Sequence, residues 1–264
     1  MIKQNLNVKN VISIIEDLFP LNLAESWDKV GLQIGEKKKK VENIVVALDL
    51  TTDVMDFAID KKADLIITYH PFLFEETSIK TGKTNFEYKN KIIDRLKKFN
   101  IAVYCIHTSF DKEPRGMSLA IKHNFKKELK TWKIKGLNSG IIVNWNDTIY
   151  ELTETFKNDF NINFFATNSD SQVKKIKNFA LINGSIPFGD INIAWKNNDI
   201  DLVVVSDIKW SNKIALREEK ITFLEISHLI EKVFINHLSK FLIKNLEKIN
   251  IFQSKAVEIV KNNF

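Results

Sequence analysis

The chain alternates between short uninterrupted apolar runs and longer segments in which apolar residues recur every three or four positions. The short runs are typical of strands buried on both faces, and the periodic segments are typical of amphipathic helices. In the first half, strands are predicted at Ile44–Leu50, Leu65–Thr68 and Ile101–Ile106. Helices are predicted between them, one that Thr51 or Thr52 can cap and that ends near Lys61, and one at Phe86–Phe99. This β-α-β-α-β order predicts mostly parallel strands with right-handed crossovers.

The remaining elements follow the same two patterns. We expect further helices at Val8–Phe19, at Met117–Phe125, from Ile149 to Phe160 with Asp147 as the cap, and along an apolar stripe from Ile230 to Leu242. We expect further strands at Gly140–Trp145, Ile162–Ala166, Lys177–Ile182, Leu202–Val205 and Ile221–Ile226. The polar segment Glu75–Thr84 is expected to be a loop, and the pattern of Ala24–Gly35 does not decide between helix and strand.

With 264 residues, the chain is long enough for one large domain or for two intertwined lobes. The basic segment Lys130–Gly136 lacks a regular pattern and is the best candidate for a boundary between lobes. In either case the fold class predicted from the order of the elements is α/β, with mostly parallel strands and helices on the faces of the sheets.

Composition restricts the cellular setting. No apolar stretch is long enough to span a bilayer, and the first residues lack the apolar core of a secretory signal, so we expect no membrane association. The single cysteine, Cys105, excludes an internal disulfide and lies in an apolar run, which favours a core position over a nucleophile. A cytoplasmic location is the default expectation.

The net charge of +6 is spread along the whole chain, and Lys37–Lys40 is the only tight basic run. Such a balance supports nucleic-acid binding only weakly, because it also promotes solubility without any partner. Neither GxGxxG nor GxxxxGK[ST] occurs, so no glycine-rich phosphate loop is expected.

Polar side chains recur where the predicted strands end. They are Asp49, His70, His107, Asp111, Asp207 and His228. Because the carboxyl ends of parallel strands share one edge of a sheet, these side chains can converge there. Histidine and carboxylate groups are ligands for Zn²⁺, and Mn²⁺ or Fe²⁺ would also accept such a mixed set. On spacing alone, a metal centre and ordinary strand ends or helix caps explain the pattern equally well.

Six sequence blocks occur in the order seen in one known protein family. They are WDKVGLQIG, LIITYHPFLF, VYCIHTSFD, ALINGS, VVVSDIK and ISHLIE. By these blocks the chain resembles the GTP cyclohydrolase 1 type 2 homologues, also called NIF-three-like proteins, from about Trp27 to the final helix. The resemblance implies two intertwined α/β lobes, which we place at approximately 1–129 plus 220–264 and approximately 130–219. It also implies a toroidal homohexamer that holds a pair of divalent metals inside the ring.

The resemblance further implies a set of metal ligands. His70 matches the second histidine of the family's HHP block, Asp111 the aspartate of its HTxxD block, and His228 the histidine of its GHxxxE block. The glutamate of that last block belongs four residues after the histidine, which in ungapped register is Lys232. A one-residue deletion would make Glu231 the ligand and would also align the final helix, so we prefer Glu231.

Several positions depart from the family pattern. The first HHP histidine is Tyr69, the WDN asparagine is Lys29, and the last histidine of TGDIKYH is Ser211. A neutral phenol replaces imidazole poorly, because its reference pKa is about 10. We therefore expect a weakened site that holds one or two divalent cations (Zn, Fe or Mn) per chain. An ammonium from Lys29 or Lys232 could replace part of the second cation's charge.

Two functions are consistent with these observations. The first is a metal-dependent hydrolase whose small-molecule substrate is a nucleotide or a phosphoester. His107 matches the HTxxD histidine beside the metals and is the candidate catalytic residue, because it is the histidine least needed as a ligand. The second is a non-catalytic hexameric ring that binds a protein or nucleic-acid partner, which the departures favour. Family membership supports a metal centre more firmly than it supports any particular reaction.

Overall fold

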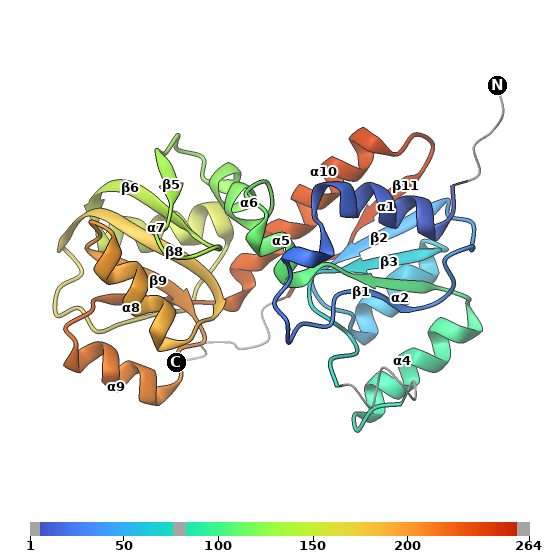
Figure 1. The fold of residues 1–264 in the computed structure, drawn as a ribbon, viewed down its shortest axis with the longest axis horizontal. Coiled ribbons are helices and arrows are strands. Elements are labelled where there is room, and N and C mark those ends of the chain that lie inside the picture. The colour runs from blue at the N-terminus through green and yellow to red at the C-terminus, as the bar shows by residue number, and fades with distance from the viewer. Residues whose placement is uncertain (1–5, 76–82, 258–264) are drawn as a thin grey trace. The chain divides into compact units, whose positions relative to one another are not determined.

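The computed structural model describes residues 6–75 and 83–257, which form two compact units (Figure 1). Unit 1 comprises the described residues up to Gly116 together with Phe234–Ala256, and unit 2 comprises Met117–Val233. Helices and strands alternate along both units, which confirms the predicted α/β class. Most of the loop predicted at Glu75–Thr84, residues 76–82, lies outside the described residues.

Unit 1 is built on a five-stranded sheet in the order β1-β4-β3-β2-β11, as far as the described residues show. The strands are β1 (Gly31–Ile34), β2 (Asn43–Ala47), β3 (Leu65–Thr68), β4 (Ala102–Cys105) and β11 (Asn250–Gln253). Strands β11, β2, β3 and β4 are parallel, and β1 pairs antiparallel with β4. The carboxyl ends of β2, β3 and β4 therefore share one edge, and Asp49, His70 and His107 follow these ends.

The helices of unit 1 are α1 (Val8–Leu18), α2 (Thr52–Asp60), α4 (Glu87–Lys98), the short α5 (His107–Lys112), and α10 (Val233–Asn245), which belongs to unit 1 from Phe234 onward; a 3-10 turn, η1 (Leu21–Leu23), follows α1. The long helices of unit 1 agree with the sequence pattern, whereas α5 and η1 were not predicted. The Thr51 side chain caps α2 by accepting from the Val54 N–H, as predicted. Cys105 is fully buried at the end of β4, as also predicted.

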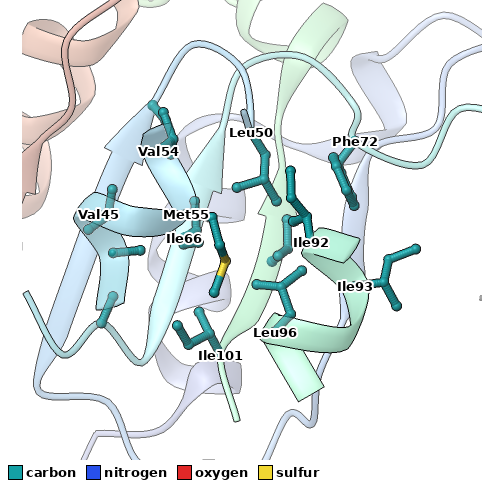
Figure 2. Packing of buried hydrophobic residues seen from close by; sticks show 14 of the residues in the cluster. Val45, Leu50, Val54, Met55, Ile66, Phe72, Ile92, Ile93, Leu96 and Ile101 are labelled. Carbon is teal, nitrogen blue, oxygen red and sulfur yellow. The ribbon is translucent and has the colours of Figure 1, made fainter. Parts of the chain in front are cut away.

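One hydrophobic core lies between this sheet and two of its helices (Figure 2). Val45, Ile66 and Val103 are register partners on adjacent strands and therefore point to the same face. Met55 of α2 and Leu96 of α4 belong to the same cluster, and both are 0% exposed. Helices α2 and α4 thus cover one face of the sheet and hold the strand ends in fixed positions.

Unit 2 contains a six-stranded sheet in the order β5-β6-β8-β9-β10-β7. The strands are β5 (Thr131–Lys133), β6 (Ile141–Thr148), β7 (Phe165–Thr167), β8 (Lys175–Ser185), β9 (Leu202–Ser206) and β10 (Phe223–Ile226). Strands β8, β9 and β10 are parallel, whereas the other described pairs are antiparallel. Asp207 follows β9 and His228 follows β10, so both leave the sheet at the same edge.

Several sequence predictions for unit 2 need correction. Its helices are α6 (Met117–Asn124), α7 (Ile149–Phe160), α8 (Phe188–Asn197), α9 (Trp210–Glu218) and the 3-10 helix η2 (His228–Lys232). The Thr148 side chain caps α7 by accepting from the Glu151 N–H, so the prediction of Asp147 as the cap was wrong. The segment Lys130–Gly136 is not wholly irregular, because Thr131 pairs with Val143 at the start of β5. Helices α8 and α9 escaped prediction because they bury few residues, with only Leu216 buried on α9.

The chain leaves unit 1 at Gly116 and returns to it at Phe234, and these points differ from the expected boundaries near residues 129 and 220. The segment after α6 is held within unit 2, since Asn124 Nδ2 donates to the Asp159 carbonyl at 2.6 Å. The Phe125 ring also lies 4.9 Å from the Phe160 ring. In residues 6–75 and 83–257, no helix combines the length and apolar character that crossing a membrane requires.

Candidate metal centre

In unit 1, the predicted ligand His70 is supported by a carboxylate. Its Nδ1 lies 2.9 Å from Oδ1 of Asp49, and the two residues follow the adjacent strands β3 and β2. Pro71 comes directly after His70 and prevents the strand from continuing. A carboxylate behind an imidazole fixes the orientation of the ring and is the usual companion of a metal-binding histidine. His70 therefore has the support that a ligand needs.

Tyr69 occupies the position at which the family resemblance places a histidine. Its side chain is 0% exposed, and its hydroxyl donates to Oδ1 of Asp111 at 2.7 Å. The Tyr69 ring also lies 4.8 Å from the His70 ring and 5.2 Å from the His107 ring, measured between centroids. The phenol thus lies among the three predicted site residues of unit 1 and binds one of them.

His107 is held by Asp28. The Nδ1 atom of His107 lies 2.9 Å from Oδ1 of Asp28, and Oδ2 of Asp28 accepts from the backbone N–H of Thr108 at 3.0 Å and from its hydroxyl. The Asp28 side chain is 0% exposed. His107 has a positive φ of 22°, which is uncommon outside glycine and frequent at functional sites. Sequence reasoning missed this role of Asp28, whose signal was an acidic residue within the WDKVG block.

Electrostatics favours the charged form of Asp28. Burial acts to raise the pKa of this carboxyl, but the hydrogen bond and the charge of His107, together with the bonds from Thr108, outweigh burial. The pKa of Asp28 is therefore lowered from its ordinary value. A charged, fully buried Asp28 holds the Nδ1 side of His107 and leaves proton exchange to Nε2.

Two exposed aromatic rings lie beside His107. Trp27 is 53% exposed and Phe74 is 48% exposed, and their ring centroids are 6.1 Å apart. The Trp27 ring lies 6.0 Å from the His107 ring. Large aromatic side chains are usually well buried, so an exposed pair near His107 offers ring faces to a ligand.

In unit 2, His228 lies between two carboxylates. Its Nδ1 is 2.5 Å from Oδ2 of Asp207, and its Nε2 is 2.8 Å from Oε2 of Glu231. Helix η2 brings His228 and Glu231 together because they are three residues apart on one turn. Glu231 is 1% exposed, and Asn183 Nδ2 donates to its other oxygen at 3.5 Å. The next residue, Lys232, points its ammonium to the Asn161 carbonyl oxygen at 3.3 Å.

The charge on His228 follows from these neighbours. Burial disfavours the charged imidazolium, but the hydrogen bonds and charges of Asp207 and Glu231 outweigh burial and raise the pKa of His228 to about 10. A positive charge thus lies between the two carboxylates in the metal-free protein. A buried carboxylate beside an imidazole nitrogen is a donor set that fits a divalent cation, which would displace the proton on binding.

The predicted site residues are divided between the units. Unit 1 carries His70, Asp111 and His107, and unit 2 carries His228 and Glu231. Within each unit the structure adds partners that strengthen the case for metal binding: Asp49 behind His70 and Asp207 behind His228. The departure at Ser211 lies exposed in the first turn of α9.

The fold and these histidine–carboxylate pairs define a two-unit α/β protein whose side chains could hold a divalent cation. Residues 6–262 match the family model of Duf34/NIF3 (NGG1p interacting factor 3), and the chain belongs to this family. A GTP cyclohydrolase 1 type 2 homolog of Mycoplasmopsis pulmonis is 32% identical over 238 residues, which cover 89% of this chain and 92% of that protein. The resemblance inferred from the six sequence blocks is thereby confirmed.

Solved structures share the fold. A hypothetical protein of Staphylococcus aureus superposes with a TM-score of 0.82 at 23% identity, covering 96% of this chain and 97% of that one. A Bacillus cereus protein related to NIF3 also gives a TM-score of 0.82, at 17% identity, covering 97% of this chain and 98% of that one. At such identities the likeness shows the fold alone.

Proposed function

We propose that this protein is a divalent-metal-dependent hydrolase acting on a nucleotide or a phosphoester. The observation that carries the proposal is the repeated histidine–carboxylate pair at strand ends, His70 with Asp49 and His228 with Asp207. Such pairs are the normal support of metal-binding histidines. Relatives named GTP cyclohydrolase 1 type 2 homolog add support for hydrolysis of a nucleotide.

The proposed ligands are His70 and Asp111 from unit 1 and His228 and Glu231 from unit 2. The expected occupancy is one or two cations of Zn, Fe or Mn per chain. A bound divalent cation supplies Lewis acidity, which acidifies water and polarises a phosphoryl or carbonyl oxygen.

His107 is the proposed proton-transfer residue. Asp28 holds the Nδ1 side of its imidazole at 2.9 Å, so Nε2 accepts or donates the proton. Trp27 and Phe74 are the proposed binding surface for a planar ring, because base–aromatic stacking contributes about 1–3 kcal/mol per base. Their exposure beside His107 favours a nucleotide over a phosphoester that lacks a ring.

A second candidate function is a non-catalytic ring that binds a protein or nucleic-acid partner. The bond between Tyr69 and Asp111 favours it, because one predicted ligand is occupied by a phenol where the family pattern has imidazole. A salt-sensitive gel shift would test whether the partner is a nucleic acid, since phosphate contacts lose affinity steeply as salt rises.

We further propose a homohexamer, on the family resemblance alone. We also propose a cytoplasmic location, which suits Cys105, a buried cysteine that forms no disulfide.

The deciding experiment is elemental analysis of the purified protein without added metal, with a native mass measured on the same sample. One or two equivalents of Zn, Fe or Mn per chain would support the hydrolase and lead to a screen over nucleotides and phosphoesters. An intact hexamer that takes up no metal even after soaking would contradict the proposal of a metal-dependent hydrolase. The non-catalytic ring that binds a partner would then remain as the candidate function.

A further inference from the structure

Glu225 is a buried carboxylate of unit 2 that the proposed metal ligands do not include. It lies in β10, between β9 and β7, and its side chain is 7% exposed. Burying a charged group costs free energy unless hydrogen bonds and an opposite charge compensate. The partners of Glu225 therefore indicate what this charge does in the unit.

Two groups satisfy the Glu225 carboxylate. Its Oε1 accepts from the backbone N–H of Ile208 at 2.8 Å, and its Oε2 lies 2.5 Å from Nζ of Lys213 on α9. Ile208 comes directly after Asp207, in the turn that connects β9 to α9. Glu225 thus ties this turn to the adjacent strand β10.

The turn has a conformation that needs such support. Asp207 has a φ of 49°, in the left-handed region that residues with a side chain adopt at a cost in free energy. The Ser185 hydroxyl donates to the Asp207 carbonyl at 3.3 Å, and the Ile208 side chain is buried in the core of unit 2. Glu225 accepts the N–H on the other side of the same turn, so the backbone on both sides of Asp207 is fixed.

We propose that Glu225 is a positioning residue for His228. Glu225 holds the Ile208 N–H, which fixes the Asp207 turn, and Asp207 in turn holds Nδ1 of His228 at 2.5 Å. Lys213 balances the charge of Glu225 and keeps its carboxylate in place. The contacts that link Glu225 to His228 all lie within unit 2. The effect of Glu225 on metal affinity rests on the proposed function.

Three variants separate positioning from a general loss of stability. Glu225→Leu removes the acceptor, and Glu225→Gln removes the charge but keeps an oxygen for the Ile208 N–H. Leu216→Ala is the matched control, because it creates a cavity under the same helix α9 but removes no hydrogen-bonding group. Zinc affinity is measured by competition with a chelator, and the melting temperature is recorded for each metal-free protein.

Glu225→Leu is expected to bind zinc more weakly by up to about 10–100-fold, because a displaced turn would take Asp207 away from behind His228. Glu225→Gln and Leu216→Ala should remain near the wild-type affinity, even where Leu216→Ala melts at a lower temperature. Wild-type affinity in Glu225→Leu, or losses that follow the melting temperature across all three variants, would overturn the proposal.

A second measurement makes the test independent of metal. In the metal-free protein, the Nδ1 proton of His228 shared with Asp207 should give a strongly downfield proton resonance. This resonance should vanish in Glu225→Leu and persist in Glu225→Gln. If the wild type binds no zinc, the proposed function fails, while the resonance still decides whether Glu225 positions His228.

Discussion

The hydroxyl of Tyr69 donates a 2.7 Å hydrogen bond to the carboxylate of Asp111, so the residue that replaces a family histidine binds a predicted metal ligand. This contact gives the substitution a definite consequence. An imidazole at position 69 could coordinate a cation directly, whereas a neutral phenol only donates a hydrogen bond to the carboxylate. The expectation of a weakened site, based on sequence, now has a specific structural cause.

Tyr69→His should increase the amount of metal bound. Since the added imidazole supplies a ligand and removes the phenol from Asp111, we expect the metal content to rise by up to one equivalent per chain. Elemental analysis of dialysed protein gives the readout. Tyr69→Phe is the control, because it removes the hydroxyl without adding a ligand and should cost about 1.5–3 kcal/mol of stability, the range for a hydrogen bond to a charged group. Equal metal content in all three proteins would contradict this account of the site.

Either Glu231 or Lys232 aligns with the glutamate of the family's GHxxxE block, depending on the register. The gain in stability on zinc binding can tell which of the two positions contributes to the site. Zinc at one hundred times its Kd should stabilise the wild type by about 2.7 kcal/mol, because binding to the folded state shifts the unfolding equilibrium. Glu231→Gln should lose this gain, since its oxygen lies 2.8 Å from Nε2 of His228. Lys232→Gln should retain it. Thermal unfolding with and without zinc is the measurement, and the reverse result would assign the site to position 232.

His107→Ala should abolish turnover while leaving metal content unchanged, because His107 is proposed to move protons and not to bind the cation. The test requires a substrate from the screen, and metal content is measured on the same preparation. Asp28→Asn should weaken turnover through the orientation of His107, whose Nδ1 it holds at 2.9 Å. Unchanged turnover in His107→Ala would remove this histidine from the mechanism.

The stability contributed by Asp28 should depend on pH in a defined direction. Its pKa in the folded protein is below the ordinary value of 3.8, so the folded state favours the carboxylate and gains stability above that pH. Asp28→Asn should therefore cost about 1–3 kcal/mol at neutral pH, as expected for hydrogen bonds to a charged group. As the pH falls through the lowered folded-state pKa, the contribution disappears and the two proteins converge.

Chemical denaturation at several pH values measures this difference. Asp60→Asn is a suitable control, because Asp60 is exposed and pairs only with the neighbouring Lys61 among the contacts described, so its removal should change stability little at any pH. A difference between wild type and Asp28→Asn that grows in acid would show that Asp28 is not charged in the folded protein.

Local patterns predicted much of the framework. Strand β3 runs from Leu65 to Thr68 as expected, because an apolar run is closed nearby by Pro71. Helix α8 could not be recognised, since its buried residues are only Ile191 and Ala194 and its remaining positions follow no apolar stripe. Strand β11 was also missed, because its few residues acquire their partner, β2, only through the fold.

The site shows the same limit. Sequence reasoning singled out Asp49 and Asp207 as polar strand ends, but the pairing of each with a histidine 21 residues away depends on strand register. The contact between Asp28 and His107 joins residues 79 positions apart, and no local pattern records it. Residue type and strand position indicated the chemistry, whereas tertiary structure decides which groups meet.

The two-segment composition of unit 1 has a consequence for biosynthesis. The last strand of its sheet, β11, pairs with β2, and the ribosome delivers β11 roughly two hundred residues after β2. Throughout that interval, β2 has an open hydrogen-bonding edge on the nascent chain, and the described strands of unit 2, β5 to β10, are all made before β11. The sheet of unit 1 is therefore completed only after the described sheet of unit 2, and until β11 arrives the open edge of β2 can pair with an incorrect strand.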